Sequence, residues 1–388
     1  MIGPFGLMPK GTVNRRALPM AKALAAEGHR VEVILPPWDH PRDSGREWVE
    51  EGVKVCNIAL PPRLPFIQHL IIVWRLVRRA LAAAPDVVHC FKPIGYSGFA
   101  AMALWLLKRL RLSKTRLVID SDDWEGKGGW SEVRGYPWAQ RRLFTWQERW
   151  CMTHCDALIV ASRALETIAW SLGVKRDRVF YVPNGMMESS QQAAHHPPPL
   201  AHRSLRVLLY TRFLEYGLER VVDIFRQVLA EVPEAQLLVV GEGPSGEGEE
   251  FLAMMREADL VDHLVYAGWV DPNVLPAYLA AADVAIYPYD DTLINRAKCS
   301  AKLTQLMGAG LPVIADDVGQ NREYIEHGVS GLLIPPGDDK AFARSVVKLL
   351  LDEGLRTRLG QGARRRILKE FNWKKLIEGV KAAYGLSS

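Results

Sequence analysis

The chain has 388 residues, which is more than one hydrophobic core ordinarily supports, so we expect two domains. Its 48% hydrophobic and 24% charged residues exclude a disordered chain and are typical of a globular protein. The apolar runs are too short to span a bilayer, and we expect no secretory signal. Five scattered cysteines favour free thiols in a reducing compartment over a disulfide framework, so we expect a cytoplasmic protein.

Positive charge and tryptophan are concentrated in the first half of the sequence. Residues 1–195 carry a formal charge of +9, the remainder carries −4, and ten of the twelve Trp lie in the first half. This combination is typical of proteins that bind nucleic acid or an anionic membrane surface. Because the sequence contains no nucleic-acid-binding motif, we expect membrane contact and no nucleic-acid partner. The alternative is that Arg and Trp cover an ordinary α/β surface.

The first half alternates apolar strands with segments of helical periodicity. This alternation predicts a parallel, doubly wound sheet. The predicted strands are 31–35, 53–58, 87–89, 117–120, 158–161 and 179–182. The predicted helices are 15–27, 69–84, 98–110, 137–154 and 163–172. Residues 1–9 are barely long enough for a strand before the turn at Gly11 and Thr12, so the first strand is either very short or truncated.

A linker and a second alternating series follow. Residues 186–204 lose the periodicity and include three successive prolines, which predicts a stiff linker. The next predicted strands are 205–210, 236–240, 264–266, 284–287, 313–315 and 332–334. The predicted helices between them are 221–231, 249–258, 275–281, 301–307 and 321–327.

The two series predict an α/β protein with two doubly wound, Rossmann-like domains. We place the first domain at residues 1–187, the linker at 188–203 and the second domain at 204–371. We expect residues 372–388 to form a helix that packs back on the first domain. The strand C-termini of two such domains are expected to face a cleft, because open α/β sheets bind their ligands there.

Residues 287–315, which run from one predicted strand through a loop and a helix to the next, have the features of an anion site. Ser300 is a plausible N-cap of the predicted helix, because its hydroxyl can accept from an amide of the first turn. A helix N-terminus at the mouth of a parallel sheet attracts anions, and Arg296, Lys298 and Lys302 cluster around this one. The alternative is an ordinary crossover with a solvated basic loop.

Several short motifs occur in an order and at a spacing that resemble a known family. They are CDALIVAS at 155–162, VPNG at 182–185, VGEGP at 240–244, GQNREYI at 319–325 and GLLIPPGD at 331–338. Together they resemble the retaining glycosyltransferases of family 4, also called glycosyltransferase group 1, over nearly the whole chain. The resemblance implies the GT-B architecture, in which two Rossmann-like domains face a cleft.

The resemblance also implies an activity. Members of the family move a sugar from a nucleotide-diphosphate sugar to an acceptor hydroxyl with retention, and GT-B enzymes generally need no metal or other cofactor. We expect a role in cell-envelope polysaccharide or glycolipid assembly, with a lipid-linked or saccharide acceptor. That acceptor would be used in the cytoplasm, at the inner face of the cell membrane.

The resemblance assigns roles to individual residues. Arg212 and Lys302 are expected to neutralise the leaving diphosphate, and Asp122 to orient or deprotonate the acceptor hydroxyl. A capping role for Asp122 in a polar loop is the alternative. The expected donor-binding residues are Gly11, Thr12, Val270, Asp271, Lys298, Ser300, Ala301 and Gln305.

Some positions depart from the family pattern. Lys298 and Gln305 occupy the positions of two glutamates, and Gln305 replaces the one that binds the donor ribose, so we expect weaker donor binding. Tyr216 replaces a lysine. Asp122 replaces a histidine, and with Asp120 it looks like a metal-binding D-x-D motif. These departures leave open a catalytically weak or silent sugar-nucleotide-binding protein, and a nucleotide-sugar 2-epimerase is a further alternative.

Two segments of the first domain join apolar faces to basic flanks. These are residues 64–84 and 98–111. Helices of this kind lie in the interface of a membrane, where arginines and lysines contact anionic headgroups. The alternative is that the apolar faces pack on the sheet and leave only arginines outside.

Overall fold

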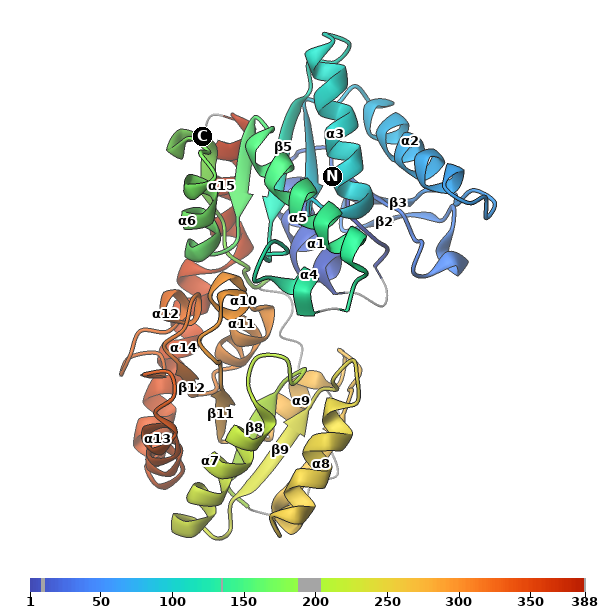
Figure 1. The fold of residues 1–388 in the computed structure, drawn as a ribbon. Coiled ribbons are helices and arrows are strands. Elements are labelled where there is room, and N and C mark those ends of the chain that lie inside the picture. Colours follow the sequence, from blue (N-terminus) through green and yellow to red (C-terminus); the bar gives the residue numbers. More distant parts are fainter. Residues whose placement is uncertain (8–10, 134, 188–203, 387–388) are drawn as a thin grey trace. The chain divides into compact units, whose positions relative to one another are not determined.

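The computed structural model describes residues 1–7, 11–133, 135–187 and 204–386. The predicted linker, 188–203, lies outside the described residues. The chain divides into two compact units (Figure 1). Unit 1 comprises Met1–Gly185, Ala297–Cys299 and Trp373–Ser388, and unit 2 comprises Met186–Arg296 and Ser300–Asn372. The three residues Ala297–Cys299 therefore belong to unit 1, although the sequence places them inside the second domain.

Unit 1 contains two sheets that meet at Ile2. In the first, β1 (Glu32–Leu35) pairs in parallel with β3 (Val53–Asn57), and β2 (Glu47–Glu50) pairs antiparallel with β3. The second is parallel, in the order β4 (Val87–Phe91), β5 (Arg116–Ser121), β6 (Ala157–Val160) and β7 (Val179–Tyr181). Ile2 bridges Ile34 of β1 and Cys90 of β4, so it takes the central place of the combined sheet. The very short first strand suggested by the sequence is reduced to this bridge.

Helices cover both faces of this sheet. Their bounds are η1 (Val13–Ala17), α1 (Leu18–Ala26), α2 (Ile67–Leu81), α3 (Gly95–Arg109), α4 (Trp130–Val133), α5 (Trp138–Thr153), α6 (Arg163–Ser171) and α15 (Trp373–Tyr384). Helix α3 packs against both α2 and α5, whereas α1 packs against α15 (Figure 1). The C-terminal helix α15 contacts β5, β6 and β7, so the chain ends in unit 1.

Unit 2 contains one parallel sheet. Its strands are β8 (Arg206–Tyr210), β9 (Gln236–Val240), β10 (Leu264–Gly268), β11 (Val284–Tyr287), β12 (Val313–Asp316) and β13 (Leu332–Ile334). They are ordered β10-β9-β8-β11-β12-β13, and every neighbouring pair is parallel. The strand order reverses between β8 and β11. Ligands of doubly wound sheets bind outside the carboxyl ends of the strands at such a point.

The helices of unit 2 surround this sheet. They are α7 (Leu218–Glu231), α8 (Glu247–Glu257), α9 (Leu275–Ala280), α10 (Leu293–Ala297), α11 (Ala301–Gly308), α12 (Asn321–Tyr324), α13 (Asp339–Leu351) and α14 (Glu353–Glu370). Helices α7 and α13 pack together, and their buried apolar side chains include Phe225, Val228, Phe342 and Val346. Burying each such side chain contributes about 1.5–3 kcal/mol to folding. The doubly wound α/β prediction is therefore confirmed in both units.

Candidate active site

The switch point of unit 2 brings two loops to the same edge of the sheet. Residues 211–217 follow β8, and residues 288–300 follow β11 and lead into α11. Since β8 and β11 are hydrogen-bonded neighbours, the loops that leave their carboxyl ends begin side by side. The sequence motifs expected to bind the donor diphosphate lie on these loops and on α11.

The start of α11 is fixed by a hydroxyl cap. Ser300 Oγ accepts from the amide of Lys302 at 3.2 Å, and Tyr287 Oη donates to the same hydroxyl. Tyr287 Oη also lies 3.0 Å from Tyr289 Oη. All three side chains are buried, so the cap is held from the sheet side. The N-cap predicted at Ser300 is confirmed, and the amides of the first turn remain directed at the carboxyl edge of the sheet.

Lys302 brings a cation to this helix end. Its side chain is buried, and its Nζ lies 5.4 Å from the centre of the Tyr210 ring. It lines a small hollow together with Tyr210, Thr211, Glu215 and Tyr289. A cation in the first turn opposes the helix dipole, so Lys302 does not stabilise α11 by charge. Its place suits an anion bound in front of the helix.

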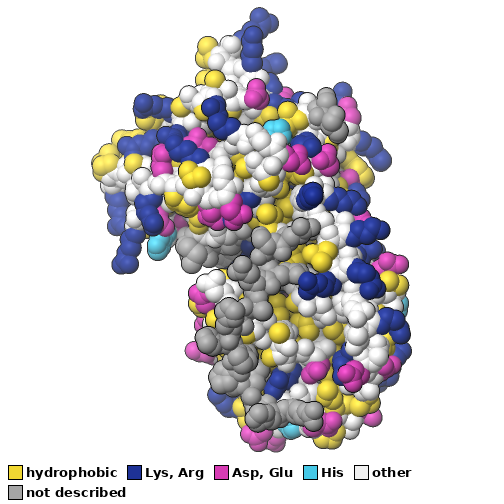
Figure 2. All heavy atoms as spheres, turned by 180° about the vertical axis from the view of Figure 1, so that it is seen from behind, with side chains coloured by type: hydrophobic (Ala, Val, Ile, Leu, Met, Phe, Trp, Pro, Cys, Tyr) yellow, Lys and Arg dark blue, Asp and Glu magenta, His cyan; other side chains and the backbone are white. Residues whose placement is uncertain are grey.

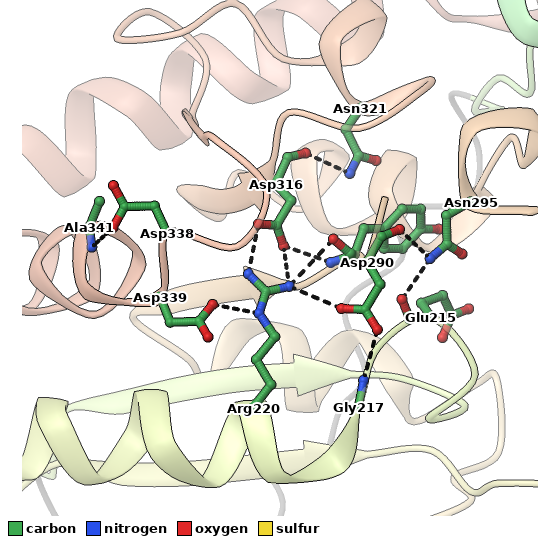
Figure 3. A network of polar contacts seen from close by, with 11 residues as sticks. Glu215, Gly217, Arg220, Asp290, Asn295, Asp316, Asn321, Asp338, Asp339 and Ala341 are labelled. Atoms are coloured by element: carbon green, nitrogen blue, oxygen red, sulfur yellow. Dashed lines mark hydrogen bonds and ion pairs between the residues drawn. The ribbon is translucent and has the colours of Figure 1, made fainter. Parts of the chain in front are cut away.

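Arg220 of α7 bonds to the end of β12, to the first residue of α13 and to the loop after β11 (Figure 3). Its guanidinium makes two hydrogen bonds to Asp316 at the end of β12, at 2.9 and 2.8 Å, and one to Asp339 at 2.6 Å. Asp316 Oδ2 also accepts from the amide of Tyr289 at 2.7 Å. Burial alone would lower the pKa of Arg220, but Asp316 and Asp339 outweigh burial and raise it, so the guanidinium stays charged.

The two loops are also bonded directly to each other. Asn295 Nδ2 donates to the carbonyls of Glu215 at 2.6 Å and Asp290 at 2.8 Å, and the amide of Gly217 donates to Asp290 Oδ2 at 3.1 Å (Figure 3). Arg220 and Asn295 therefore set the position of the loops that hold the site. Sequence reasoning missed both. The available signal for Arg220 was an Arg immediately before a predicted helix, after the glycine at position 217.

Arg212 and Tyr216 have different surroundings in the loop after β8. Arg212 is exposed, and among the described residues it has no ion pair. Tyr216 is buried and its hydroxyl donates to Thr211 Oγ1 at 2.8 Å. Thr211 Oγ1 also accepts from the amide of Phe213, whose φ of +59° is unusual for a residue with a Cβ. The tyrosine that replaces the family lysine therefore shapes the loop from within.

Gln305 and Ala301 lie on α11 with Lys302. Ala301 is the first residue of the helix. Gln305 Oε1 is buried, and it has no hydrogen-bond partner among the residues that the structure describes. A buried acceptor without a partner is unfavourable by roughly 1–3 kcal/mol, so a donor group on a ligand would stabilise it. The structure thus brings Ser300, Ala301, Lys302 and Gln305 together on one helix.

Lys298 belongs to unit 1 with its neighbours in the chain. Ser162 Oγ donates to the carbonyl of Ala297 at 2.7 Å, and Asn184 Nδ2 donates to that of Cys299 at 2.6 Å. Lys298 Nζ lies 5.5 Å from the centre of the Trp130 ring. Within its unit, this residue is therefore held beside the end of β6 and not on α11.

Val270 and Asp271 lie in the loop after β10. Asp271 Oδ1 accepts from the amide of Asn273 at 2.8 Å, and its carbonyl accepts from Val274 and Leu275. These bonds form the turn that opens α9, which explains Asp271 without a ligand. The side chain of Asp271 is exposed, and that of Val270 is half-buried.

In unit 1, Asp122 follows β5 in a buried, charged cluster. Its Oδ1 is buried and has no hydrogen-bond partner within the described ranges. Burial raises the pKa of Asp122 to about 6, although Lys92 acts in the opposite direction. Lys92 Nζ itself pairs with Glu125 at 2.8 Å and Asp123 at 3.2 Å. A carboxylate with this pKa can accept a proton from an acceptor hydroxyl near neutral pH.

Asp120, which begins the acidic run around Asp122, pairs with an arginine. Arg16 Nε lies 2.7 Å from Asp120 Oδ1, and Arg16 Nη2 lies 2.9 Å from Asp120 Oδ2. Arg16 also donates to Asn184 Oδ1 at 3.1 Å. Across the described part of the chain, no three His, Cys, Asp or Glu side chains are arranged to hold a metal ion.

Gly11 and Thr12 lead into the first helix of unit 1. The carbonyl of Gly11 accepts from the amide of Arg15 at 2.9 Å. A Cβ at Gly11 would lie 3.2 Å from Nε of the exposed Arg15 side chain, which can move aside, so the space around Gly11 does not by itself require glycine. The Thr12 side chain makes no capping hydrogen bond to the helix that it precedes.

In the described ranges, none of the helices has the length and apolarity needed to cross a membrane.

Comparisons with known proteins agree with this architecture. Residues 11–185 match the family model described as "Glycosyl transferase 4-like domain", and residues 205–352 match "Glycosyl transferases group 1". A phosphatidyl-myo-inositol mannosyltransferase of Mycobacterium leprae is 26% identical over 99% of this chain and 95% of its own length.

Solved structures show the same fold. Sucrose-phosphate synthase from Thermosynechococcus elongatus matches with a TM-score of 0.75 and 22% identity, over 97% of this chain and 93% of that chain. Anabaena HepE, solved in complex with UDP and glucose, matches with a TM-score of 0.70 and 15% identity, over 98% and 97% of the two chains. The chain is therefore a glycosyltransferase that belongs to the group 1, family 4 enzymes and has the GT-B fold of two Rossmann-like units.

Proposed function

We propose that this glycosyltransferase moves a sugar, with retention, from a nucleotide-diphosphate sugar to an acceptor hydroxyl in cell-envelope polysaccharide or glycolipid assembly. One observation carries the donor assignment: the buried Lys302 in the capped first turn of α11. Anabaena HepE was solved with UDP, which supports a nucleoside diphosphate as the ligand. The diphosphate would accept hydrogen bonds from the α11 amides and lie against Lys302.

The chemistry needs charge stabilisation more than a covalent nucleophile. When the bond between the anomeric carbon and the diphosphate oxygen breaks, its electron pair leaves with the diphosphate. Lys302, the α11 amides and Arg212 would stabilise that growing negative charge. The exposed Arg212 has the freedom to reach the bound phosphates. The acceptor hydroxyl forms the new bond to the anomeric carbon, and Asp122 would orient it or take its proton.

Gln305 extends the donor site along α11. Its buried Oε1 would accept from a ribose hydroxyl of the nucleotide. Gly11 and Thr12 would approach the phosphates through their backbone, and Val270 would contact the base, as the resemblance implies. Lys298, Ser300, Ala301 and Asp271 complete the proposed donor set. The bonds of Asp271 within its own turn make its contribution to the ligand a matter of backbone shape.

We place the acceptor at the inner face of the cell membrane, as a lipid-linked or saccharide hydroxyl. The name of the mycobacterial relative includes a phosphatidylinositol, which supports a lipid acceptor. All five cysteines are buried and free, which supports a reducing, cytoplasmic location.

Calorimetric titration of UDP and of other nucleoside diphosphates tests the donor site. We expect Lys302→Ala and Arg212→Ala each to weaken binding of the nucleotide that the wild type prefers by about 1.5–3 kcal/mol, because each removes a charge-assisted contact. Lys340→Ala is the matched control, since Lys340 is an exposed lysine of α13. Wild-type affinity in both site variants would reject this assignment.

Retention is tested on the product. We expect the anomeric configuration of the donor to be kept in the new glycosidic bond. The one-bond carbon–proton coupling and the three-bond proton–proton coupling at the anomeric centre, measured by NMR, report it. An inverted product would overturn the mechanism proposed here and leave the donor site untouched. Incubation with the nucleotide sugar alone adds a check on chemistry, because epimerisation of the free donor would contradict glycosyl transfer as the main reaction.

A further inference from the structure

Helix α2 of unit 1 exposes a row of large apolar side chains. Phe66 is 86% exposed, Leu70 71%, Ile67 55% and Trp74 55%. Residues 67, 70 and 74 follow one another at helical spacing, so they share one outer stripe. Phe66, which precedes the helix, has a φ of +59°, a strained value for a residue with a Cβ. The structure therefore holds a strained phenylalanine in solvent at the end of an apolar stripe.

This stripe is separate from the face by which α2 packs on unit 1. The buried residues of the helix are Ile72, Leu76, Val77 and Ala80. Leu76 and Val77 lie within the predicted membrane-facing segment 64–84, but their side chains are buried and therefore do not belong to the exposed stripe. An ordinary crossover helix would expose only its polar residues once its apolar face is packed. Helix α2 exposes a second apolar stripe as well.

The charge around the stripe has one sign. Between Glu51 and Asp120 the sequence carries eleven Lys or Arg and a single acidic residue, Asp86. Arg63 and Arg78 are exposed, and Arg78 lies 5.1 Å from the centre of the Trp74 ring. Arg79 is paired with Glu32 at 2.7 Å and is not part of this free charge. Figure 2 shows Lys and Arg side chains beside hydrophobic ones along the upper left edge of unit 1.

The neighbouring helix α3 continues the pattern at its C-terminal end. Leu106 is 51% exposed, Leu110 58% and Leu112 71%, and Arg109 and Arg111 between them are exposed. Helices α2 and α3 pack on each other, and His69 Nδ1 lies 2.6 Å from Tyr96 Oη across their contact. The two helices thus form one layer of unit 1 with apolar and basic side chains on its outer side.

We propose that the outer face of α2, with Phe66, Leu70, Trp74, Arg63 and Arg78, is a docking surface for an anionic lipid bilayer. The apolar side chains enter the interfacial region, and the arginines contact lipid phosphates. A protein partner would need acidic groups to match this face, whereas a bilayer of anionic lipid supplies charge and apolar depth together. The inference rests on the proposed function, because it brings the enzyme to a lipid-linked acceptor.

Co-sedimentation of the full chain with vesicles tests the proposal. The probes are vesicles of equal parts phosphatidylglycerol and phosphatidylcholine, and vesicles of phosphatidylcholine alone. We expect the wild type to bind the anionic vesicles at low salt, to bind the neutral ones weakly, and to dissociate as salt increases. No binding to anionic vesicles at low salt would overturn the proposal.

Paired variants separate the two contributions. Leu70→Ser with Trp74→Ser removes the apolar contact, and we expect at least tenfold weaker binding at every salt concentration. Arg63→Gln with Arg78→Gln removes two cations, and we expect roughly 30-fold weaker binding at low salt and a flatter salt dependence. The matched controls are Leu351→Ser and the pair Arg344→Gln with Arg358→Gln, all exposed residues of unit 2. Loss of binding in the controls as large as in the α2 variants would contradict this surface.

Two further measurements keep the result interpretable. The α2 side chains point outward, so thermal unfolding of the variants should match the wild type, and Phe66→Ser serves as an independent apolar variant. Nucleotide titration should also be unchanged, because these residues lie outside the donor site. Vesicle binding without nucleotide binding would contradict the proposed function but not the proposal that the outer face of α2 docks on a bilayer. Self-association that Leu70→Ser with Trp74→Ser abolishes, without vesicle binding, would identify a second copy as the occupant and overturn it.

Discussion

The two units place an arginine–aspartate pair at corresponding points of their sheets. In unit 1, Arg16 of η1, in the first helical segment, pairs with Asp120 at the end of β5. In unit 2, Arg220 of the first helix, α7, pairs with Asp316 at the end of β12. In unit 1, β5 lies two places from the Ile2 bridge, which takes the place of the first strand. In unit 2, β12 lies two places from the first strand, β8. The same topology therefore creates the same buried position for a carboxylate and for the cation opposite it.

The surroundings of the two pairs differ. Arg16 and Asp120 are both buried, and Asp120 Oδ2 also lies 3.5 Å from His89 Nε2. Burial alone would raise the pKa of Asp120, but Arg16 and His89 outweigh it and hold that pKa below its ordinary value. Arg220 keeps 11% of its side chain exposed and reaches Asp339 and the Tyr289 loop as well. The buried Arg16–Asp120 pair therefore anchors a core, whereas the Arg220–Asp316 pair holds the loops of a site.

The largest effect is expected from breaking the unit 1 pair. Arg16→Met leaves Asp120 buried without its cation, so we expect the free energy of unfolding to fall by about 3–5 kcal/mol. Thermal and denaturant unfolding measure this loss. Arg46→Met is the control, because Arg46 pairs with Asp43 at 2.6 Å but is 68% exposed, and its loss should stay below about 1 kcal/mol. Similar losses in both variants would contradict the anchoring role of Arg16.

Breaking the Arg220–Asp316 pair should lower the free energy of unfolding less than breaking the Arg16–Asp120 pair. It should also weaken donor binding. For Arg220→Met we expect a loss of about 3 kcal/mol in unfolding free energy, because the pair is partly exposed. Nucleotide affinity should also fall, since the Tyr289 loop loses its support. Arg220→Lys keeps the charge without the two-pronged geometry and should lie between. Unfolding and calorimetry on the same samples check both effects, and unchanged affinity with reduced stability would limit Arg220 to a structural role.

Each unit holds buried side-chain oxygens without a hydrogen-bond partner in the described chain, and two of them, Asp122 Oδ1 in unit 1 and Gln305 Oε1 in unit 2, belong to expected site residues. The folded pKa of Asp122, about 6, lies above its ordinary value of 3.8, so folding favours the protonated form. That stability is fully present below about pH 4 and is lost as pH rises through about 6. Asp122→Asn cannot ionise, so it should be more stable than the wild type at pH 8 by about 3 kcal/mol, and equally stable at pH 4.

The pH dependence of activity is a second test of the role of Asp122. If this carboxylate takes the proton of the acceptor, kcat/KM should rise with pH through about 6, and Asp122→Asn should lose that limb. The groups that act on Asp122 are Lys92, Asp123, Asp120 and Arg16, so Asp123→Asn is the control with the nearest charge change. Equal stability of Asp122→Asn and wild type at pH 8 would contradict the raised pKa.

The second such oxygen is Gln305 Oε1 in unit 2, and it gives the smallest expected effect. Gln305→Glu places a charged acceptor where the family has one, and we expect donor binding to tighten by about 1–2 kcal/mol, or roughly tenfold. Titration of the nucleotide sugar measures it, and Gln236→Glu on β9 offers a control outside the site. Unchanged affinity together with a lower melting temperature would exclude a ribose contact.

Most of the fold follows from local sequence signals. Apolar runs that alternate with helix-length segments predicted the parallel strands to within a few residues, because such strands are buried on both faces. Strand β2 was missed, since Glu47–Glu50 alternates exposed and half-buried residues at the edge of the sheet. Helices α13 and α14 were not predicted either, although Asp338 caps the first and Asp352 the second. Their polar outer faces dilute the apolar stripe that marks a helix.

The site divides in the same way between local and distant interactions. Ser300 and Lys302 are two residues apart, so the cap and its cation were predictable from the sequence. Arg220 and Asp316 are 96 positions apart, and Arg16 and Asp120 are 104 apart. Only the order of the strands brings such pairs together, and no spacing rule contains it. The placement of Lys298 in unit 1 was missed for the same reason, because its neighbours bond to Ser162 and Asn184.

The placement of Ala297–Cys299 has a practical consequence for dissecting this enzyme. These residues belong to unit 1, although the chain on both sides of them belongs to unit 2. A fragment of residues 186–372 would carry away the carbonyls to which Ser162 and Asn184 donate. Those two buried groups would then lack partners in the remaining fragment, at a penalty of about 1–3 kcal/mol each. Labelling one half for spectroscopy therefore calls for co-expression of split genes or for intein ligation, since unit 1 expressed without residues 297–299 lacks these two contacts.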